Sequence, residues 1–561
     1  MRKSSGSGYS INRRDVGWMV LIVFIYGLLS FIGLGSLKNP QTFWEKPDFE
    51  EDYSVVELDK LQNVSKLRSF TGPRFGEYKL YGSEDGRRFI YLGTLKQEKV
   101  FAWSDMSIDN SFKYFGIEAT EELGSIGEIA LYDSQGERIG LRAQTEDAKL
   151  LVDEAQMVPQ KISFLNSTYF DEVYHARTAY EYIHHMTIYE WTHPPLGKLI
   201  MSLPIHLWGM NTFSYRLMGN LAGIFMLPVL YILAKKLFGH TRYGLVAALL
   251  LAADGMHFVQ TRIATVDSFL VLFIMLSYLF MFCYIQCEDR TPLSSKLMYL
   301  ALSGLFIGAA IATKWNGAYG AIGLAIIFFA DFIRRSRDKY HRYIWEGQII
   351  IILLSCVVFF ILLPVGVYLG SYLPFFYSEG GKTFKDFIDL QLQMYHYHAD
   401  LEATHPFTSP WYLWPLNIKP IWYYKGEARE GNIVTIALMG NPLIWWSGIL
   451  GFFYTIKKWI SERKKEAFFI IVAILSLYLP YVLVSRIMFL YHYFPIVPFM
   501  ILALTHLLKD IVKRMDDSAL LKWYTGAMVI TFIFFYPIYS GTEIPLWYGV
   551  MTRWLPAWQY Y

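Results

Sequence analysis

The chain has 561 residues, of which 54% are hydrophobic and only 18% are charged. Ordinary soluble domains carry about a quarter charged residues, so this composition excludes one large soluble domain and indicates a polytopic membrane protein. The formal net charge of +3 is too small to suggest a nucleic-acid partner. The three cysteines lie in apolar segments and imply neither a disulfide framework nor a thiolate metal site.

The first apolar segment, residues 16–35, follows basic residues and is too long for the core of a cleaved signal sequence. It predicts a retained transmembrane helix with a cytoplasmic N-terminus. Further apolar segments long enough to cross the hydrocarbon bring the prediction to about eleven spans. Their centres lie near Phe225, Leu250, Phe273, Leu305, Leu324, Val357, Ser447, Leu475, Pro498 and Phe532.

Basic residues are distributed as this topology requires. With the N-terminus inside, every second connection faces the cytoplasm and is expected to collect Lys and Arg. These residues are concentrated in the alternate connections, at 235–242, 290–296, 334–342, 457–465 and 509–514. An odd number of spans then places the C-terminus outside.

The first long outer connection contains short segments of alternating polarity separated by turn sequences, which predicts an extracytoplasmic β-sandwich over residues 39–165. Its Gly-Ser-Glu-Asp-Gly turn, Trp103 and the later IGEIALYD segment resemble discoidin-like, galactose-binding jelly rolls. The resemblance implies a carbohydrate contact, and a structural or acceptor-docking module is the alternative.

The second long outer connection, residues 371–434, is rich in Tyr, Trp, His and Pro, which suits a segment at the membrane surface. The expected parts of the chain are a tail with the first span (1–38), the β-sandwich (39–165), an outer loop with surface helices (166–213), spans 2–7 (214–370), the aromatic outer loop (371–434), spans 8–11 (435–541) and an outer C-terminal tail (542–561).

Two adjacent carboxylates, Asp171 and Glu172, follow the expected β domain directly. They precede a short amphipathic helix that also carries Tyr174 and His175. Carboxylates at the start of a helix often cap its free N–H groups. That structural role is the alternative to a catalytic one.

Ionisable side chains also stand at the outer ends of the expected spans. One such cation is usually an interfacial anchor or a snorkelling side chain. Several cations on one side of a bundle, together with paired carboxylates, are better explained by a phosphate-bearing substrate and a base. The residues concerned are Lys198, Arg216, Arg262, Asp267, Lys314 and Arg486.

This combination predicts a reaction of a lipid-linked sugar phosphate. Arg and Lys would stabilise the anion that develops as the sugar–phosphate bond breaks. An Asp near the anomeric carbon would accept the proton of the attacking hydroxyl. Attack from the face opposite the leaving group inverts the configuration.

Seven segments, taken in chain order, resemble the dolichyl-phosphate-mannose protein mannosyltransferase family, a multi-span branch of the C-type glycosyltransferase (GT-C) superfamily. They are FDEVYHARTAYEYI, THPPLGKLI, SYRLMGN, TRIATVDSFLVLF, ATKWNGAYG, HPFTSPWYLWPL and RIMFLYHYFP. The resemblance implies that Asp171 is the catalytic base, that Glu172 is its neighbour in the acceptor or sugar site, and that Arg216 is needed for activity. It also implies contacts with donor phosphate or lipid by Arg216, Arg262, Arg486 and Lys198, and with substrate by His193, Tyr174, His175, Asp267, Lys314, Trp315, Trp411, Tyr491 and His492.

The chain departs from the eukaryotic members, which place the acidic pair soon after the first span and carry a β-trefoil domain in a later loop. Here a β domain intervenes first, and the later loop is too short for a trefoil. The compact form resembles a bacterial member that uses polyprenyl phosphate, which implies the bacterial plasma membrane.

The preferred interpretation is an inverting glycosyltransferase that moves a hexose, mannose by resemblance, from polyprenyl phosphate to Ser or Thr of exported proteins. One alternative keeps the donor but sends the sugar to a cell-wall glycopolymer or glycolipid. Another is a lipid or solute transporter, although the sequence shows no internal repeat and its charges cluster at one face. A further set of aromatic and imidazole side chains is better explained by packing at the membrane interface, with a divalent metal site as the alternative. The set comprises Tyr395, His396, Tyr397, His398 and His405, and no cofactor or metal ligand is assigned.

Overall fold

The computed structural model describes the chain except residues 1–8, 46–52, 121–123, 289, 338–341 and 518. It divides into two compact units, which are described separately. The helical unit comprises Met1–Gly33, Trp191–Ile200 and Met218–Tyr561, and the β-containing unit comprises Leu34–Glu190 and Met201–Leu217.

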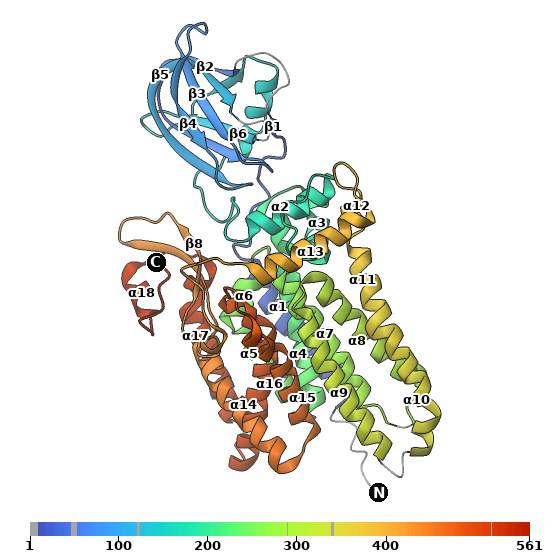
Figure 1. Ribbon diagram of the computed structural model, residues 1–561. Coiled ribbons are helices and arrows are strands. Elements are labelled where there is room, and N and C mark those ends of the chain that lie inside the picture. Colours follow the sequence, from blue (N-terminus) through green and yellow to red (C-terminus); the bar gives the residue numbers. More distant parts are fainter. Residues whose placement is uncertain (1–8, 46–52, 121–123, 289, 338–341, 518) are drawn as a thin grey trace. The chain divides into compact units, whose positions relative to one another are not determined.

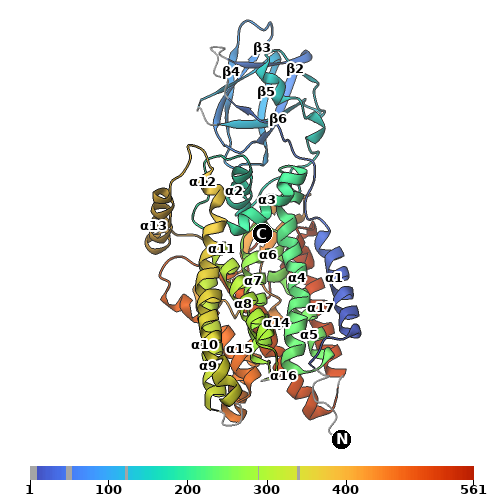
Figure 2. The same cartoon turned by 90° about the vertical axis from the view of Figure 1, so that its right-hand side faces the viewer.

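Long apolar helices make up most of the helical unit (Figures 1 and 2). The helices that lie in it wholly or largely are α1 (Arg13–Phe31), α4 (Thr212–Phe238), α5 (Thr241–Ala252), α6 (Gly255–Thr261), α7 (Asp267–Ile285), α8 (Leu293–Thr313), α9 (Gly317–Arg337), α10 (Arg342–Val357), α11 (Leu363–Ser371), α12 (Leu373–Phe376), α13 (Phe384–Asp400), α14 (Pro442–Glu462), α15 (Lys465–Tyr478), α16 (Val497–Met515), α17 (Ala519–Ser540) and α18 (Leu546–Met551).

Within the described residues, 9 helices are long and apolar enough to cross a membrane, and the bent pair α5 and α6 gives a tenth. Each expected span centre falls on one of these helices or on α14. Helix α14 is less apolar because it carries Trp445, Trp446, Lys457 and Lys458. The prediction of a polytopic helical membrane protein is confirmed.

The 62° bend between α5 and α6 is built around Asp254. Its carboxyl group accepts hydrogen bonds from the backbone N–H groups of His257 and Asn441, each at 3.0 Å, and from the indole N–H of Trp445 at 2.8 Å. These donors offset the penalty of burying a polar group. Gly255 follows at the bend, where an added Cβ would lie 2.6 Å from the Met439 carbonyl oxygen.

A small sheet joins two parts of the helical unit that are far apart in sequence. Strands β8 (Ile421–Gly426), β9 (Asn432–Leu438) and β10 (Ile544–Pro545) pair antiparallel in the order β10-β9-β8. The aromatic loop and the C-terminal tail therefore lie at the same end of the bundle, as an odd number of spans predicts.

The β-containing unit includes a β domain, whose strands are β1 (Trp44–Glu45), β2 (Ser54–Thr71), β3 (Glu77–Ser83), β4 (Ile90–Lys96), β5 (Trp103–Ala119), β6 (Ser125–Tyr132) and β7 (Leu141–Ala143). They pair antiparallel in the order β1-β6-β2-β5-β3-β4, with β7 on β2. Register shifts interrupt the pairing of the long strands β2 and β5, and one buried cluster around Leu67, Phe115 and Ile129 forms the core. The predicted inserted β domain is confirmed, and its strands join into one sheet that bends around this core.

Candidate active site

In the β-containing unit, Asp171 and Glu172 lie where the chain enters helix α2 (Glu172–Ile183). Phe170 precedes them with φ 49°, a left-handed conformation that is strained for an aromatic residue. The Asp171 side chain makes no capping hydrogen bond to α2 and is partly exposed. The capping role that was the alternative for this carboxylate is therefore not observed.

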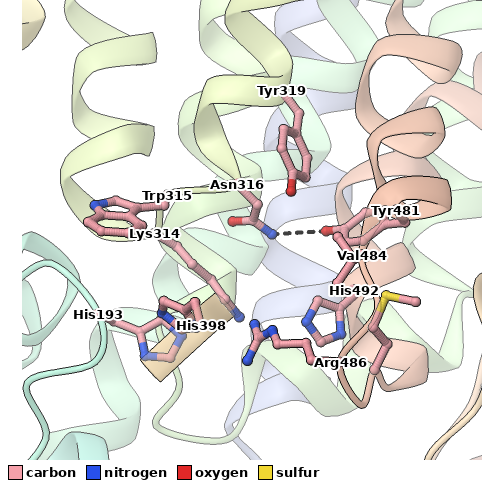
Figure 3. A pocket seen from close by; sticks show the side chains of 11 residues that line it. His193, Lys314, Trp315, Asn316, Tyr319, His398, Tyr481, Val484, Arg486 and His492 are labelled. Carbon is pink, nitrogen blue, oxygen red and sulfur yellow. Dashed lines mark hydrogen bonds between the residues drawn. The ribbon is translucent and has the colours of Figure 1, made fainter. Parts of the chain in front are cut away.

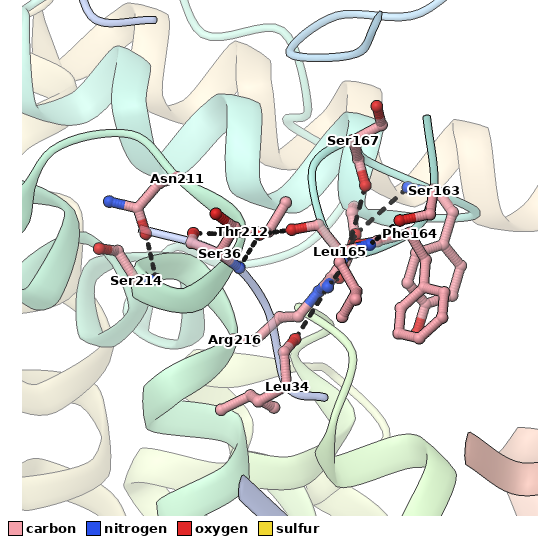
Figure 4. Close-up of polar contacts among 12 residues, drawn as sticks. Leu34, Ser36, Ser163, Phe164, Leu165, Ser167, Asn211, Thr212, Ser214 and Arg216 are labelled. Atoms are coloured by element: carbon pink, nitrogen blue, oxygen red, sulfur yellow. Dashed lines mark hydrogen bonds and ion pairs between the residues drawn. The ribbon is translucent and has the colours of Figure 1, made fainter. Parts of the chain in front are cut away.

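Glu172 has a different environment, because it is fully buried against Arg216. The Nε and Nη2 atoms of Arg216 donate to the two carboxylate oxygens at 2.6 and 2.7 Å. Its Nη1 donates to the carbonyl oxygens of Leu34 at 2.9 Å and Phe164 at 2.7 Å (Figure 4). These contacts fit a residue that positions the start of α2, whereas the sequence suggested a phosphate contact for Arg216.

The other expected residues of this unit lie on α2. Tyr174 is exposed and stacks on Tyr189 with ring centroids 6.3 Å apart. His175 is buried, with its Nδ1 3.7 Å from the Glu190 carboxylate. Tyr174 is therefore accessible to a ligand, and His175 is packed beneath the surface.

The helical unit contains a cavity of about 320 Å³ at the junction of α8 and α9 (Figure 3). The segment between α15 and α16, the end of α13 and the segment that precedes α3 (Leu196–Trp208) complete its wall. Five of the expected residues line it, namely His193, Lys314, Trp315, Arg486 and His492. Six more were not assigned a substrate contact from the sequence, namely Asn316, Tyr319, His398, Tyr481, Val484 and Met488.

Two cations of the cavity come from separate segments of the chain. The Nζ of Lys314 donates to Asp267 at 2.9 Å and lies 5.3 Å from the centroid of the Tyr491 ring. Arg486 forms no hydrogen bond or ion pair with any other described residue. Asp267 pairs with Lys314, so the charge of Arg486 is not offset by an ion pair with a described carboxylate, and this excess positive charge suits an anionic ligand such as a phosphate.

Neutral hydrogen-bonding groups lie beside these cations. The Nε2 of His398 lies 2.8 Å from the Thr192 carbonyl oxygen, so Nε2 carries the proton and Nδ1 is left as an acceptor. Burial is the main cause that lowers the pKa of His398 to about 4. The Nδ1 of His398 and the Oδ1 of Asn316 have no hydrogen-bond partner among the described residues. The cavity therefore offers acceptors for hydroxyl groups next to cations for a phosphate.

Five expected residues of the helical unit do not line the cavity. Two of them, Asp267 and Tyr491, contact Lys314 as described above, and the other three lie elsewhere. Lys198 is buried and its Nζ donates to the His193 carbonyl oxygen at 2.8 Å. The Nε of Arg262 donates to the carbonyl oxygen of Ser30 at the end of α1, at 3.0 Å. Trp411 packs on Tyr478 with ring centroids 5.5 Å apart. Lys198 and Arg262 thus hold backbone segments in place, and Trp411 belongs to an aromatic cluster.

Sequence reasoning also missed a chain of contacts that leads to Lys314. The Tyr423 hydroxyl donates to Gln260 at 2.7 Å, and the Gln260 amide donates to Asp267 at 3.3 Å. Gln260 immediately precedes the quoted segment TRIATVDSFLVLF, so its position was visible in the sequence. Nothing in the sequence pairs it with a tyrosine so far along the chain.

Within the described residues, no group of three or more His, Cys, Asp or Glu side chains is placed to hold a metal ion. The alternating histidines have different partners, since His396 lies 3.1 Å from Asp400 while His398 faces the cavity.

Two family models match the chain. The one described as "Dolichyl-phosphate-mannose-protein mannosyltransferase" matches residues 207–377, and the one described as "C-terminal four TMM region of protein-O-mannosyltransferase" matches residues 383–558. The chain belongs to the protein O-mannosyltransferase family. Both matches begin after the β domain, so these two family models do not include it.

Several family relatives are similar over most of their length. The polyprenol-phosphate-mannose–protein mannosyltransferase of Mycolicibacterium smegmatis is 24% identical over 456 residues, which cover 70% of this chain and 87% of the relative. The Mycobacterium tuberculosis protein of the same name is 23% identical and covers 70% of this chain and 86% of the relative. Among solved structures, the Saccharomyces cerevisiae protein O-mannosyltransferase Pmt1–Pmt2 complex bound to the sugar donor aligns with a TM-score of 0.63 at 15% identity, over 70% of this chain and 89% of that chain. The last similarity shows that the fold is shared.

Proposed function

We propose that this protein is an inverting glycosyltransferase that moves mannose from a polyprenyl-phosphate carrier to Ser or Thr hydroxyls of exported proteins. Family membership and the names of the mycobacterial relatives support the donor and the protein acceptor. The observation that carries the proposal is the cavity in which Lys314 and Arg486 meet with one carboxylate nearby.

In this proposal the donor phosphate lies between Lys314 and Arg486. The two cations offset the charge that develops on the phosphate oxygen as its bond to the sugar breaks. Trp315 packs against the sugar, while Asn316 Oδ1 and His398 Nδ1 accept hydrogen bonds from its hydroxyl groups. Asp267 holds Lys314 in place, and Gln260 and Tyr423 hold Asp267.

Asp171 is the proposed general base, with Glu172 and Arg216 as positioning residues. The acceptor hydroxyl gives its proton to the Asp171 carboxylate as its oxygen bonds to the anomeric carbon. The bond from that carbon to the phosphate oxygen breaks, and polyprenyl phosphate leaves with the electron pair. Attack opposite the leaving group inverts the configuration at the anomeric carbon.

The arrangement argues against a transporter. Substrate sites of secondary transporters lie near the middle of the membrane, at broken helices. The cavity here lies at the ends of α8 and α15, beside the loop segments that precede α9 and α16. We place it on the extracytoplasmic face of a bacterial plasma membrane, because the basic connections mark the opposite ends of the spans.

The transfer is tested with membranes that contain the full-length protein, polyprenyl phosphate carrying labelled mannose, and a Ser/Thr-rich secreted protein. Label is expected in the protein fraction, released by alkaline β-elimination, with the anomeric configuration opposite to that of the donor. Label that appears only in glycolipid or polymer would refute the protein acceptor. Absence of transfer to any fraction would refute the donor.

For the β domain we propose a carbohydrate contact at an aromatic surface cluster. The rings of Tyr53 and Tyr81 lie 4.5 Å apart and those of Tyr81 and Tyr91 lie 5.9 Å apart, centroid to centroid. Tyr91 is 55% exposed, and aromatic rings of this kind combine apolar area with a hydroxyl handle. Retention of the full-length protein on immobilised mannan, lost in Tyr91→Ala, is the expected result, and unchanged retention would exclude this cluster.

A further inference from the structure

Helix α13 stands apart from the spans because it runs across the direction of α10 and α11 (Figures 1 and 2). Its start is fixed by a capping box, in which the Thr383 side chain accepts from the Asp386 backbone N–H and the Asp386 carboxylate accepts from the Thr383 N–H. At its other end His398 lines the cavity. The helix thus has a fixed N-terminus, and its C-terminal turn forms part of the wall of the candidate site.

One face of α13 packs on the protein. Phe387 and Met394 are buried in this face. The ring centroid of Phe387 lies 5.0 Å from that of Tyr372, the residue that follows α11. The Tyr368 hydroxyl donates to Gln391 at 2.6 Å and accepts from the Trp315 indole at 2.9 Å. The packed face therefore has polar as well as apolar contacts, and these reach a residue of the cavity.

A second face carries large apolar side chains that no described residue covers. Phe384, Ile388, Leu392 and Tyr395 are 64%, 43%, 54% and 59% exposed. Their spacing of four, four and three residues places them on one side of the helix. We call this set the apolar stripe. The adjoining side of the helix is polar and exposed, with Lys385, Asp389, Gln393, His396 and Asp400.

The stripe continues a surface that faces lipid. The span Gly347–Ser371 is only 11% buried, and its exposed side chains include Leu354, Ile361 and Leu369. Beyond that span, Leu373 and Tyr377 are also exposed and lead to the start of α13. An apolar stripe beside a polar face, next to a membrane span, is typical of a helix that lies in the membrane–water interface.

We infer that α13 lies in the plane of the membrane at the cavity end of the bundle, with the apolar stripe among the lipid acyl chains. This position in the membrane fixes the C-terminal turn of the helix, and so keeps His398 hydrogen-bonded to the Thr192 carbonyl in the wall of the cavity. The second part rests on the proposed function, because it links lipid contact to donor binding. The position of the helix in lipid stands without it.

The position is tested by quenching of a fluorescent label on the full-length protein in phosphatidylcholine–phosphatidylglycerol vesicles. Single cysteines are introduced by Leu392→Cys in the stripe and Gln393→Cys on the polar face, after Cys283, Cys287 and Cys356 are replaced by Ala. Bimane on residue 392 is expected to be quenched by brominated acyl chains and protected from aqueous iodide, and bimane on residue 393 is expected to show the reverse. Equal quenching of both labels by iodide would overturn the inference, and this readout requires no activity.

The link to the cavity is tested with the matched pair Leu392→Glu and Gln393→Glu. A charge in the stripe is expected to raise the donor KM at least about fivefold, because a carboxylate is unfavourable among acyl chains and would displace the helix from the membrane. The donor KM of the polar-face variant is expected to stay within about twofold of the wild type. A rise in the acceptor KM alone would show that the stripe docks the acceptor protein, and would refute the lipid assignment. Unchanged kinetics in both variants would refute the link to donor binding while leaving the quenching result to decide the position.

Discussion

Asp171 and Glu172 are neighbouring carboxylates, and the fold gives them different surroundings. Glu172 is buried with two hydrogen bonds from Arg216, whereas Asp171 is partly exposed and makes no capping bond. A buried ion pair fixes geometry more than it adds net stability, because desolvation offsets much of the attraction. Variants of Asp171 should therefore change turnover, and variants of Glu172 should change folding.

The substitution Asp171→Asn removes the proposed base while keeping the size of the side chain. We expect kcat to fall by about 10²- to 10⁴-fold, the usual contribution of a general base, with the thermal unfolding temperature in detergent unchanged. Mannose transfer under donor and acceptor saturation measures the first, and a melting curve of the same sample measures the second. Turnover within about twofold of the wild type would remove Asp171 as the base.

Glu172→Gln leaves the Arg216 guanidinium buried without its carboxylate. Breaking a buried pair in this way is expected to cost about 3–5 kcal/mol of unfolding free energy and to lower the melting temperature markedly. The matched control is Glu77→Gln, because Glu77 pairs with Lys96 and the two side chains are 44% and 66% exposed, and exposed pairs contribute little to stability. Similar melting temperatures for the two variants would contradict the positioning role of the Glu172–Arg216 pair.

Arg486 allows a clean test of the cation pair, because its removal leaves no carboxylate unpaired among the described residues. Arg486→Gln is expected to weaken donor binding on the order of 10- to 100-fold, as the loss of a charged hydrogen bond implies. Arg486→Lys should recover part of this loss, and Arg429→Gln should leave the donor KM unchanged. A donor KM that is the same in Arg486→Gln and wild type would exclude this cavity as the phosphate site.

At the scale of elements, the bend between α5 and α6 places the end of α6, and with it Gln260 and Arg262, at the site end of the bundle. The bend depends on the three donors that satisfy Asp254. It also depends on Gly255, because a side chain there would overlap the Tyr539 ring and the Met439 carbonyl oxygen. Local packing at one break in a helix thus decides where Gln260 and Arg262 lie.

Gly255→Ala tests this dependence. The added methyl group forces α6 away from Tyr539, and overpacking of this kind costs about 1–3 kcal/mol, so a lower melting temperature and reduced donor binding are expected. Gly526→Ala is the matched control in helix α17, because an added Cβ there meets nothing within 4 Å, and Ala is the better helix former. Equal stability of the two variants would show that the bend tolerates a side chain.

At the scale of the whole molecule, sequence patterns predicted what depends on local chemistry. Hydropathy located the spans, alternating polarity located the β domain, and charges at span ends pointed to Lys314 and Arg486. The interaction partner of each side chain could not be predicted, because the Arg216–Glu172 pair and the contact of His398 with Thr192 join residues far apart in sequence. The partner of Arg262 could not be predicted either, because the sequence allows its guanidinium to bind a phosphate as readily as the carbonyl groups at the end of α1.

The sidedness of the chain is the remaining prediction at this scale. Pairing of β9 with β10 places the aromatic loop and the C-terminal tail at one end of the bundle, and the Lys- and Arg-rich connections mark the other end as cytoplasmic. A membrane-impermeant maleimide should therefore label Glu402→Cys and Gln559→Cys in intact cells, and should label Lys513→Cys only after permeabilisation. The parent chain is the background control for its own cysteines. Labelling of Lys513→Cys in intact cells, with protection of the other two, would invert the topology and place the cavity on the cytoplasmic side, where exported acceptors could not reach it.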